Sequence, residues 1–188
     1  QSFFKSKMKD RLQWYYQQIL KITFVINFIK KNNKKIIIWD ADTIITKKIN
    51  FFEGENSIKY GTLFEHHQEY FTTVKSIFGY LPKYYISSLV QFICITENEC
   101  NFLLKLLKVS EIQNKDLAIT LSNLILNNVI KNHNKYSNSL FSEYELIGIS
   151  NLLNNNKKQN AIFTLRSGLN GQLTKNQSLI AKILNVYH

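Results

Sequence analysis

Apolar side chains recur at three- and four-residue steps over residues 9–29, which is the spacing of one face of an α-helix. Neither Gly nor Pro interrupts this stretch, so the pattern predicts a helix. A polar turn at residues 30–34 separates it from residues 35–39, which contain three consecutive isoleucines. Such a β-branched run is typical of a buried strand, and we expect parallel pairing because parallel strands are apolar on both faces.

Helical and extended patterns alternate along the rest of the chain. Gly79 and Pro82 mark the end of one expected helix, and Ser142 and Glu145 have the spacing of a capping box at the start of another. We find neither an internal repeat nor a long linker, so residues 1–188 are expected to form a single α/β domain. The patterns predict helices at residues 66–78, 98–109, 115–133, 142–153 and 177–186, and extended segments at residues 44–49, 84–95 and 161–165.

Length and charge limit the functions that this chain can have. No apolar run among the 188 residues reaches the roughly 18 that a membrane-spanning helix needs. The formal net charge is +11, and the first fifty residues alone hold 11 Lys and Arg against 3 Asp. A local basic face binds phosphate on nucleic acid, on an anionic membrane or on a nucleotide, or it is simply a solvated surface.

The cysteines and the N-terminus bear on where the protein is located and on whether the chain is preceded by a further segment. Cys94 and Cys100 lack CxxC spacing, which favours a reducing compartment. We therefore expect a cytoplasmic protein, with peripheral association at the inner membrane face through its basic N-terminal region. The chain begins with Gln1 and not with Met, and we expect that a segment before it is missing.

The strongest candidate for chemistry follows the isoleucine strand directly. Asp40 and Asp42, one residue apart at the strand end, can share one hard divalent cation that bridges the phosphates of a nucleotide diphosphate. In the alternative, Asp40 caps a turn and Asp42 is solvated. Haloacid-dehalogenase-type phosphatases also place Asp-x-Asp after an apolar strand, but Ile44 stands where they carry Thr or Val.

Four blocks in order resemble a family of bacterial glycosyltransferases that was long known only as a domain of unknown function and is related to the GT-A nucleotide-sugar transferases. The resemblance implies a GT-A-like, Rossmann-like mixed sheet flanked by helices, here lacking the first N-terminal strands. It also implies metal-dependent transfer of a sugar from a nucleotide-diphosphate donor to a glycan, lipid-linked or surface-polymer acceptor. The blocks are Trp14-Tyr15-Tyr16-Gln17-Gln18-Ile19-Leu20-Lys21, Ile38-Trp39-Asp40-Ala41-Asp42-Thr43, Glu65-His66-His67 with Tyr70-Phe71, and Phe141-Ser142-Glu143-Tyr144-Glu145 with Gly148.

The resemblance also implies roles for single residues. Asp40 and Asp42 would hold Mn²⁺ or Mg²⁺ against the donor diphosphate. Gln18 and Lys21 would lie behind this site, with Lys21 either facing phosphate or snorkelling from an amide network. Glu65 and His66 would lie near the acceptor; in the alternative, they belong to a solvated loop. Glu143 would recognise the acceptor or act as the general base.

Two other classes of function stay open at this point. A net charge of +11 with ten tyrosines fits a polyanion- or nucleic-acid-binding protein, although Tyr15 and Tyr16 lie inside apolar patterns and are better explained as core. A transferase-like protein without catalytic activity is the other alternative. Because the basic excess flanks the strand that leads to Asp40, we expect the partner to be donor phosphate, or an anionic membrane that carries the acceptor, and not nucleic acid.

Overall fold

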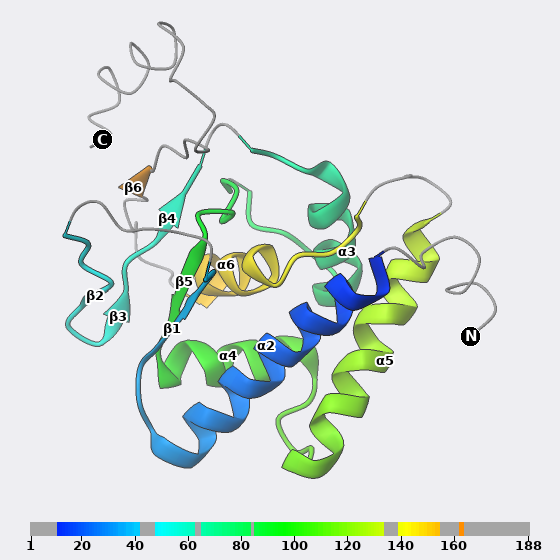
Figure 1. Cartoon of the computed structure of the whole chain (residues 1–188), viewed down its shortest axis with the longest axis horizontal. Coiled ribbons are helices and arrows are strands. Elements are labelled where there is room, and N and C mark those ends of the chain that lie inside the picture. The colour runs from blue at the N-terminus through cyan, green and yellow to red at the C-terminus, as the bar shows by residue number, and fades with distance from the viewer. Residues whose placement is uncertain are drawn as a thin grey trace, which may run out of the picture.

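The computed structural model describes residues 11–41, 48–62, 65–83, 85–133, 139–154 and 162–163. These residues form a mixed α/β structure in which helices pack against one side of a short pair of strands (Figure 1). The elements in chain order are α2 (Leu12–Asn32), β1 (Ile36–Trp39), β2 (Phe52–Glu53), β3 (Asn56–Ser57), β4 (Tyr60–Gly61), α3 (Gln68–Phe78), β5 (Phe92–Ile95), α4 (Glu97–Leu107), α5 (Asn114–His133), α6 (Glu143–Asn154) and β6 (Ile162–Phe163).

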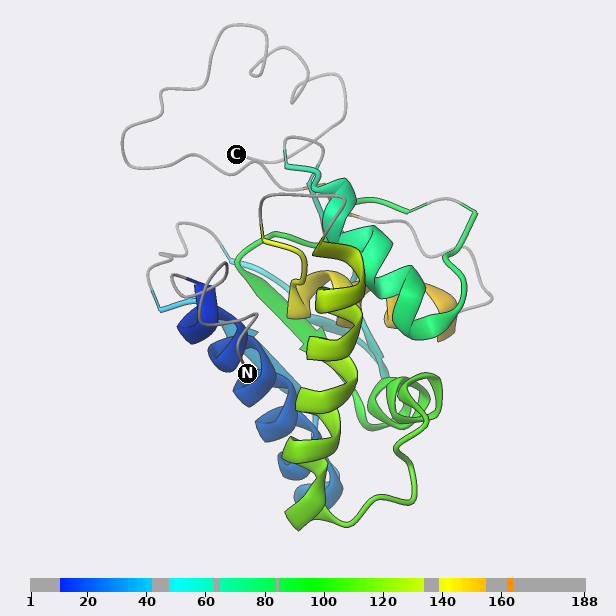
Figure 2. The ribbon, with the colours of Figure 1, turned by 90° about the vertical axis from the view of Figure 1, so that its right-hand side faces the viewer.

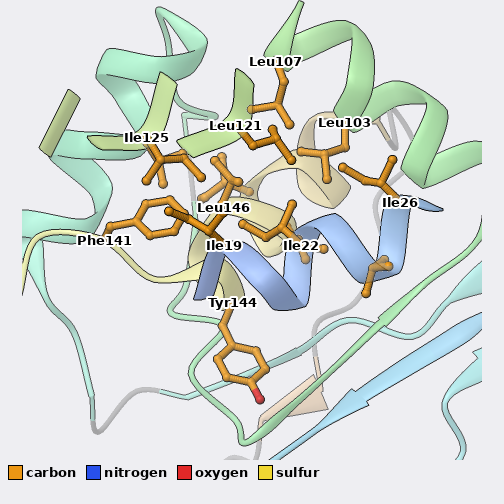
Figure 3. Close-up of a cluster of buried hydrophobic side chains, with 14 of the residues drawn as sticks. Ile19, Ile22, Ile26, Leu103, Leu107, Leu121, Ile125, Phe141, Tyr144 and Leu146 are labelled. Carbon is orange, nitrogen blue, oxygen red and sulfur yellow. The ribbon is translucent and has the colours of Figure 1, made fainter. Parts of the chain in front are cut away.

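The hydrophobic core forms where the helices meet. Every residue of α6 from Glu143 to Asn151 is buried, and this helix packs against α2, α3, α4 and β5. Helix α5 closes the other side of the core by packing against α2 and α3. Figure 3 shows the contributions of the separate elements, with Ile22 and Ile26 of α2 on the side of Leu103 and Ile19 beside Phe141 and Leu146.

The described strands form three two-stranded sheets. β1 pairs with β5 in antiparallel register, with Ile36 opposite Ile95 and Trp39 opposite Phe92, so the expected parallel pairing is wrong. The burial of β1 explains the error, because Ile38 is buried whereas Ile37 is 37% exposed. One face of the strand therefore meets the helices while the other is partly open, as antiparallel strands allow. The other sheets are the β2–β3 hairpin and the parallel pair β4–β6.

The extended segment expected at residues 84–95 is a regular strand only over its last four residues. Before β5 the backbone turns: Gln91 has a φ of 69°, and the N–H of Val90 donates to the carbonyl of Ser88. Ser87 and Ser88 are buried there against α6. Apolar composition predicted extension correctly near Ile95, but it carried no signal for this turn.

The predicted helices at 9–29, 66–78, 98–109, 115–133 and 142–153 are confirmed as α2 to α6. α3 ends where expected, because Gly79 takes a φ of 87° and its N–H donates to the carbonyl of Lys75. Of the strand expected at 161–165, residues 162–163 form β6. The helix expected at 177–186 and residues 44–47 of the extended segment lie outside the described residues. Among the described helices, none has the length and apolar character to cross a membrane.

A buried ion pair that the sequence did not signal ties the β2–β3 hairpin to α4. The Glu99 carboxylate completes a capping box with Thr96 at the start of α4. The same carboxylate accepts from Lys59 Nζ at 2.8 Å and from Ser57 Oγ at 2.6 Å. Although burial opposes the charged carboxylate, these donors lower the pKa of Glu99. Because the buried Glu99 carboxylate has several hydrogen-bond donors, it fixes the β2–β3 hairpin against α4.

Candidate functional site

A polar cleft of about 390 Å³ opens where α2, the end of β1, the start of α3, the turn before β5 and the start of α6 meet. These elements are far apart in sequence, so the cleft forms only when the domain folds. Carboxylates, side-chain amides and aromatic rings share its wall, as in many sites for small polar ligands. The lining residues are Trp14, Gln17, Gln18, Lys21, Asp40, Ala41, Glu65, Tyr70, Leu89, Gln91, Ser142, Glu143 and Tyr144.

Lys21 is the central charge of this cleft. Its Nζ donates to Asp40 Oδ1 at 2.6 Å and to Glu143 Oε1 at 2.8 Å, and it lies 5.1 Å from the centre of the Tyr144 ring. Burial alone would lower the pKa of Lys21, but the two carboxylates outweigh it and the pKa is raised. Lys21 is therefore a permanent cation held between two acids, with 20% of its side chain open to solvent.

Glu143 is the most deeply buried of the acids that line the cleft. Its side chain has no exposed surface, and its backbone N–H donates to Gln18 Oε1 at 3.2 Å. Oε1 accepts from Lys21, whereas Oε2 is buried with no hydrogen-bond partner among the described residues. Burial raises the pKa of Glu143, although Lys21 partly opposes that shift. Glu143 therefore binds a proton more readily than an exposed glutamate does.

Asp40 stands at the cleft edge. Its backbone N–H donates to the carbonyl of Gln91 at 2.9 Å, which extends the β1–β5 pairing by one residue and fixes the position of the side chain. A quarter of that side chain is exposed, and Ala41 beside it lines the same cleft. Asp42, the second member of the predicted metal pair, lies outside the described residues.

Glu65 and His66, the two residues predicted to lie near the acceptor, have different positions in the structure. Glu65 lines the cleft, and its Oε1 lies 3.3 Å from His67 Nε2. The His66 ring instead stacks on the buried Phe71 ring at 4.6 Å and lies 6.5 Å from that of Tyr85. His66 is not among the cleft-lining residues, because its ring serves as packing for α3.

Comparison with protein-family models, with curated proteins and with solved structures finds no match to this chain. Gln18, Lys21, Asp40, Glu65 and Glu143, singled out from the sequence, line one cleft.

Sequence reasoning gave no role to several residues of the cleft wall. Trp14 and Tyr70 stack with ring centres 6.2 Å apart and form one side of it. Tyr144 extends away from the other labelled core side chains in Figure 3, and its hydroxyl donates to the carbonyl of Gln91 at 3.4 Å. Trp14, Tyr70 and Tyr144 stood in the resemblance blocks, which was the available signal. No sequence signal indicated Gln91, because its position in the cleft depends on a turn in which its own φ is positive.

Glu145 supports the cleft from behind. Its carboxylate accepts from Ser87 Oγ at 2.6 Å and from the backbone N–H of Ser88 at 3.1 Å. Both oxygens point across to the turn before β5, so the capping-box role predicted for Glu145 is replaced by a tertiary one. That turn carries Leu89 and Gln91 into the cleft. Burial raises the pKa of Glu145 to about 7, although the hydrogen bonds from Ser87 and Ser88 partly oppose it.

We expect Glu145 to make stability fall as pH rises from about 4.5 to about 7. In that window the folded state keeps a proton that the unfolded chain has already released, so the unfolded state binds fewer protons and the unfolding free energy declines with pH. Relative to Glu145→Gln, the wild type should lose about 2 to 3 kcal/mol across the window. Urea unfolding at closely spaced pH values measures the difference. Parallel stability curves for the two proteins would contradict the assignment, and Glu111→Gln at an exposed position is the control.

Proposed function

We propose that this chain is a GT-A-like glycosyltransferase that moves a sugar from a nucleotide-diphosphate donor to a hydroxyl group of a glycan or other surface-polymer acceptor. One observation carries the proposal. Lys21 and Glu143, which are 122 residues apart in sequence, join Asp40 in a single charged cluster on the cleft wall. These three residues belong to three separate blocks of the resemblance, which predicted a common site.

The chemistry of the cleft supports a sugar-bearing ligand. The rings of Trp14, Tyr70 and Tyr144 offer flat apolar surfaces against which the C–H face of a sugar can pack. Carboxylate and amide groups beside them, including Glu65 and Gln17, can hydrogen-bond its hydroxyls. A volume of about 390 Å³ lies within the range of small-molecule sites.

Asp40 fits the predicted divalent cation. Mg²⁺ is commonly held by one or two carboxylates together with substrate phosphates and water, so a large cluster of protein ligands is not required. No group of three or more His, Cys, Asp or Glu that suits a metal occurs among the described residues. Asp40 and Asp42 would hold the ion, which supplies charge neutralisation for the departing nucleoside diphosphate.

In the proposed reaction the acceptor oxygen bonds to the anomeric carbon as the bond from that carbon to the diphosphate oxygen breaks. The acceptor hydroxyl gives up its proton, and the diphosphate leaves with the bonding electron pair. Lys21, held between Asp40 and Glu143 on the cleft wall, adds positive charge beside the donor phosphates and so helps to stabilise the negative charge that develops there. Because Glu143 is fully buried behind Lys21, we assign it first to positioning that ammonium group; its raised pKa also suits it to accept the proton.

Calorimetric titration with UDP, GDP and CMP, with and without Mn²⁺, tests this function. We expect one nucleotide to bind in a metal-dependent way, and Asp40→Asn and Asp42→Asn each to weaken that binding at least about tenfold, which corresponds to about 1.4 kcal/mol. Glu143→Gln should weaken it through the loss of charge beside Lys21. Glu55→Gln is the matched control, because Glu55 also pairs with a lysine but is 85% exposed. Unchanged binding in Asp40→Asn, or metal-independent binding of oligonucleotides only, would contradict the proposal.

A further inference from the structure

The outward face of α2 carries a row of apolar side chains that the domain does not cover. Leu12, Tyr16, Leu20 and Phe24 are exposed by 47%, 63%, 45% and 62%. Four-residue steps place them on one side of the helix. The row continues to Phe28, whose ring stacks with that of Phe24 at a centre-to-centre distance of 5.9 Å. We call these five residues the α2 stripe. Figure 2 shows α2 running along one edge of the molecule, with its length open on the outer side.

The charged side chains of α2 itself all have one sign. The 21 residues of α2 include no Asp or Glu, and Lys30 and Lys31 occupy its last turn. Arg11 is exposed just before the helix and Lys34 just after it. An exposed apolar stripe with cations at both ends and no anion along its length is the composition of a helix that lies in a membrane interface.

We propose that the α2 stripe docks this domain on an anionic lipid surface. The apolar side chains would enter the boundary between headgroups and acyl chains, and the flanking Lys and Arg would contact lipid phosphates. A second copy of this chain fits the stripe poorly. In a symmetric dimer the cations that flank the stripe of one α2 would face those of the other, with no acid on the helix to compensate them.

Docking there would also place the cleft close to the lipid. Gln18 and Lys21 reach the cleft from the neighbouring side of the same helix, and Gln17, which lines the cleft, is itself exposed beside the stripe. If the proposed function holds, a membrane-bound acceptor would lie within reach of the cleft. The docking itself does not depend on that function, because vesicle binding requires neither donor nor acceptor.

Cosedimentation of the full chain with vesicles tests the docking surface. The vesicles contain phosphatidylcholine alone or an equimolar mixture with phosphatidylglycerol. We expect binding to the anionic vesicles, with at least about a tenfold loss in Leu20→Gln/Phe24→Gln, because two buried apolar side chains are removed from the interface. Lys31→Gln/Lys34→Gln and raised salt should also weaken the binding. Ile119→Gln is the matched apolar control, since Ile119 is 64% exposed on α5 and outside the stripe. Lys105→Gln is the matched charge control.

Three results would overturn the proposal. The first is equal affinity of the wild type and Leu20→Gln/Phe24→Gln for anionic vesicles. The second is no preference for phosphatidylglycerol over phosphatidylcholine alone. The third is a dimer in sedimentation equilibrium that Leu20→Gln/Phe24→Gln dissociates, together with no vesicle binding, which would make a second copy the occupant. Circular dichroism of each variant establishes that the helices are retained, so that a loss of binding reports on the surface.

Discussion

Lys21→Met is expected to lower the free energy of unfolding by about 3 to 5 kcal/mol, the usual cost of removing one partner from a buried ion pair. Lys21 is the shared cation of Asp40 and the fully buried Glu143, so its loss leaves two acids facing each other without compensation. Met keeps the apolar stem and removes only the charge. Urea unfolding followed by tryptophan fluorescence at pH 7 measures the change.

The pH dependence of this loss gives a second check. The pKa of Glu143 is already raised with Lys21 present, and without the ammonium group it must rise further. Protonation of Glu143 then removes the uncompensated charge, so the destabilisation in Lys21→Met should shrink as pH is lowered from 7 to 5. A loss that stays constant over this range would contradict the role given to Glu143.

The exposed pair of Lys35 and Glu55 supplies the control. Their side chains are 34% and 85% exposed at an Nζ–Oε1 distance of 3.2 Å, and Lys35→Met should change the unfolding free energy by less than about 1 kcal/mol. In addition, Lys21→Met/Glu143→Met should recover much of the stability, because no isolated charge remains at Glu143. If Lys21→Met lowered the unfolding free energy as little as Lys35→Met, the cluster of Lys21, Asp40 and Glu143 would not contribute to stability.

The helices of this domain were predictable because their signals are local. Apolar spacing over residues 66–78 and 98–109 reports which side of each helix is buried, and Gly79 provides the left-handed residue that ends α3. Helix formation needs only this short-range information. The register and direction of strands depend on partners that are distant in sequence. That is why the isoleucine run predicted β1 but gave its pairing with β5 the wrong direction.

The candidate site divides in the same way. Asp40 was singled out because two carboxylates follow an apolar strand, and Lys21 and Glu143 because they stand in blocks of the family resemblance. Which partner each would meet did not follow from the sequence, because helix α6 brings Glu143 to Lys21 only through the packing of the whole core. Glu145 shows the limit clearly. Its spacing from Ser142 fits a local cap, yet the side chain binds Ser87 and Ser88.

The turn before β5 is therefore the part of the domain where the core and the cleft depend on each other. Its backbone contributes the Gln91 carbonyl that accepts from the Asp40 N–H, and the Ser87 hydroxyl and Ser88 N–H donate to the buried Glu145 carboxylate. The contact requires α6 to approach very closely. Gly148, one turn after Glu145, is the residue that permits this approach, since a Cβ there would overlap Ser88 Oγ and lie 2.5 Å from Ser88 Cβ.

Gly148→Ala is accordingly expected to destabilise the domain by about 4 kcal/mol. Overpacking in a dense core costs about 1 to 3 kcal/mol. Moving Ser88 away also stretches the hydrogen bond from its N–H to Glu145, and weakening the pairing of a buried carboxylate adds about 1 to 3 kcal/mol. The clash involves the first atoms of the Ser88 side chain, which no rotamer change can carry far enough. Thermal and urea unfolding measure the loss, and donor binding should fall with it because Gln91 shares the displaced turn.

Ser88→Gly combined with Gly148→Ala provides the decisive comparison. Removing the Ser88 side chain leaves only its Cα, at 4.0 Å from the new methyl group, which is ordinary contact. The backbone N–H that donates to Glu145 is retained, so the double variant should be more stable than Gly148→Ala alone despite the extra flexibility of glycine. Such a reversal is expected only if helix α6 and the turn meet at these two residues. If the double variant loses as much unfolding free energy as the two single variants together, Gly148 matters for another reason. The turn would then not depend on its contact with Gly148 to support the cleft.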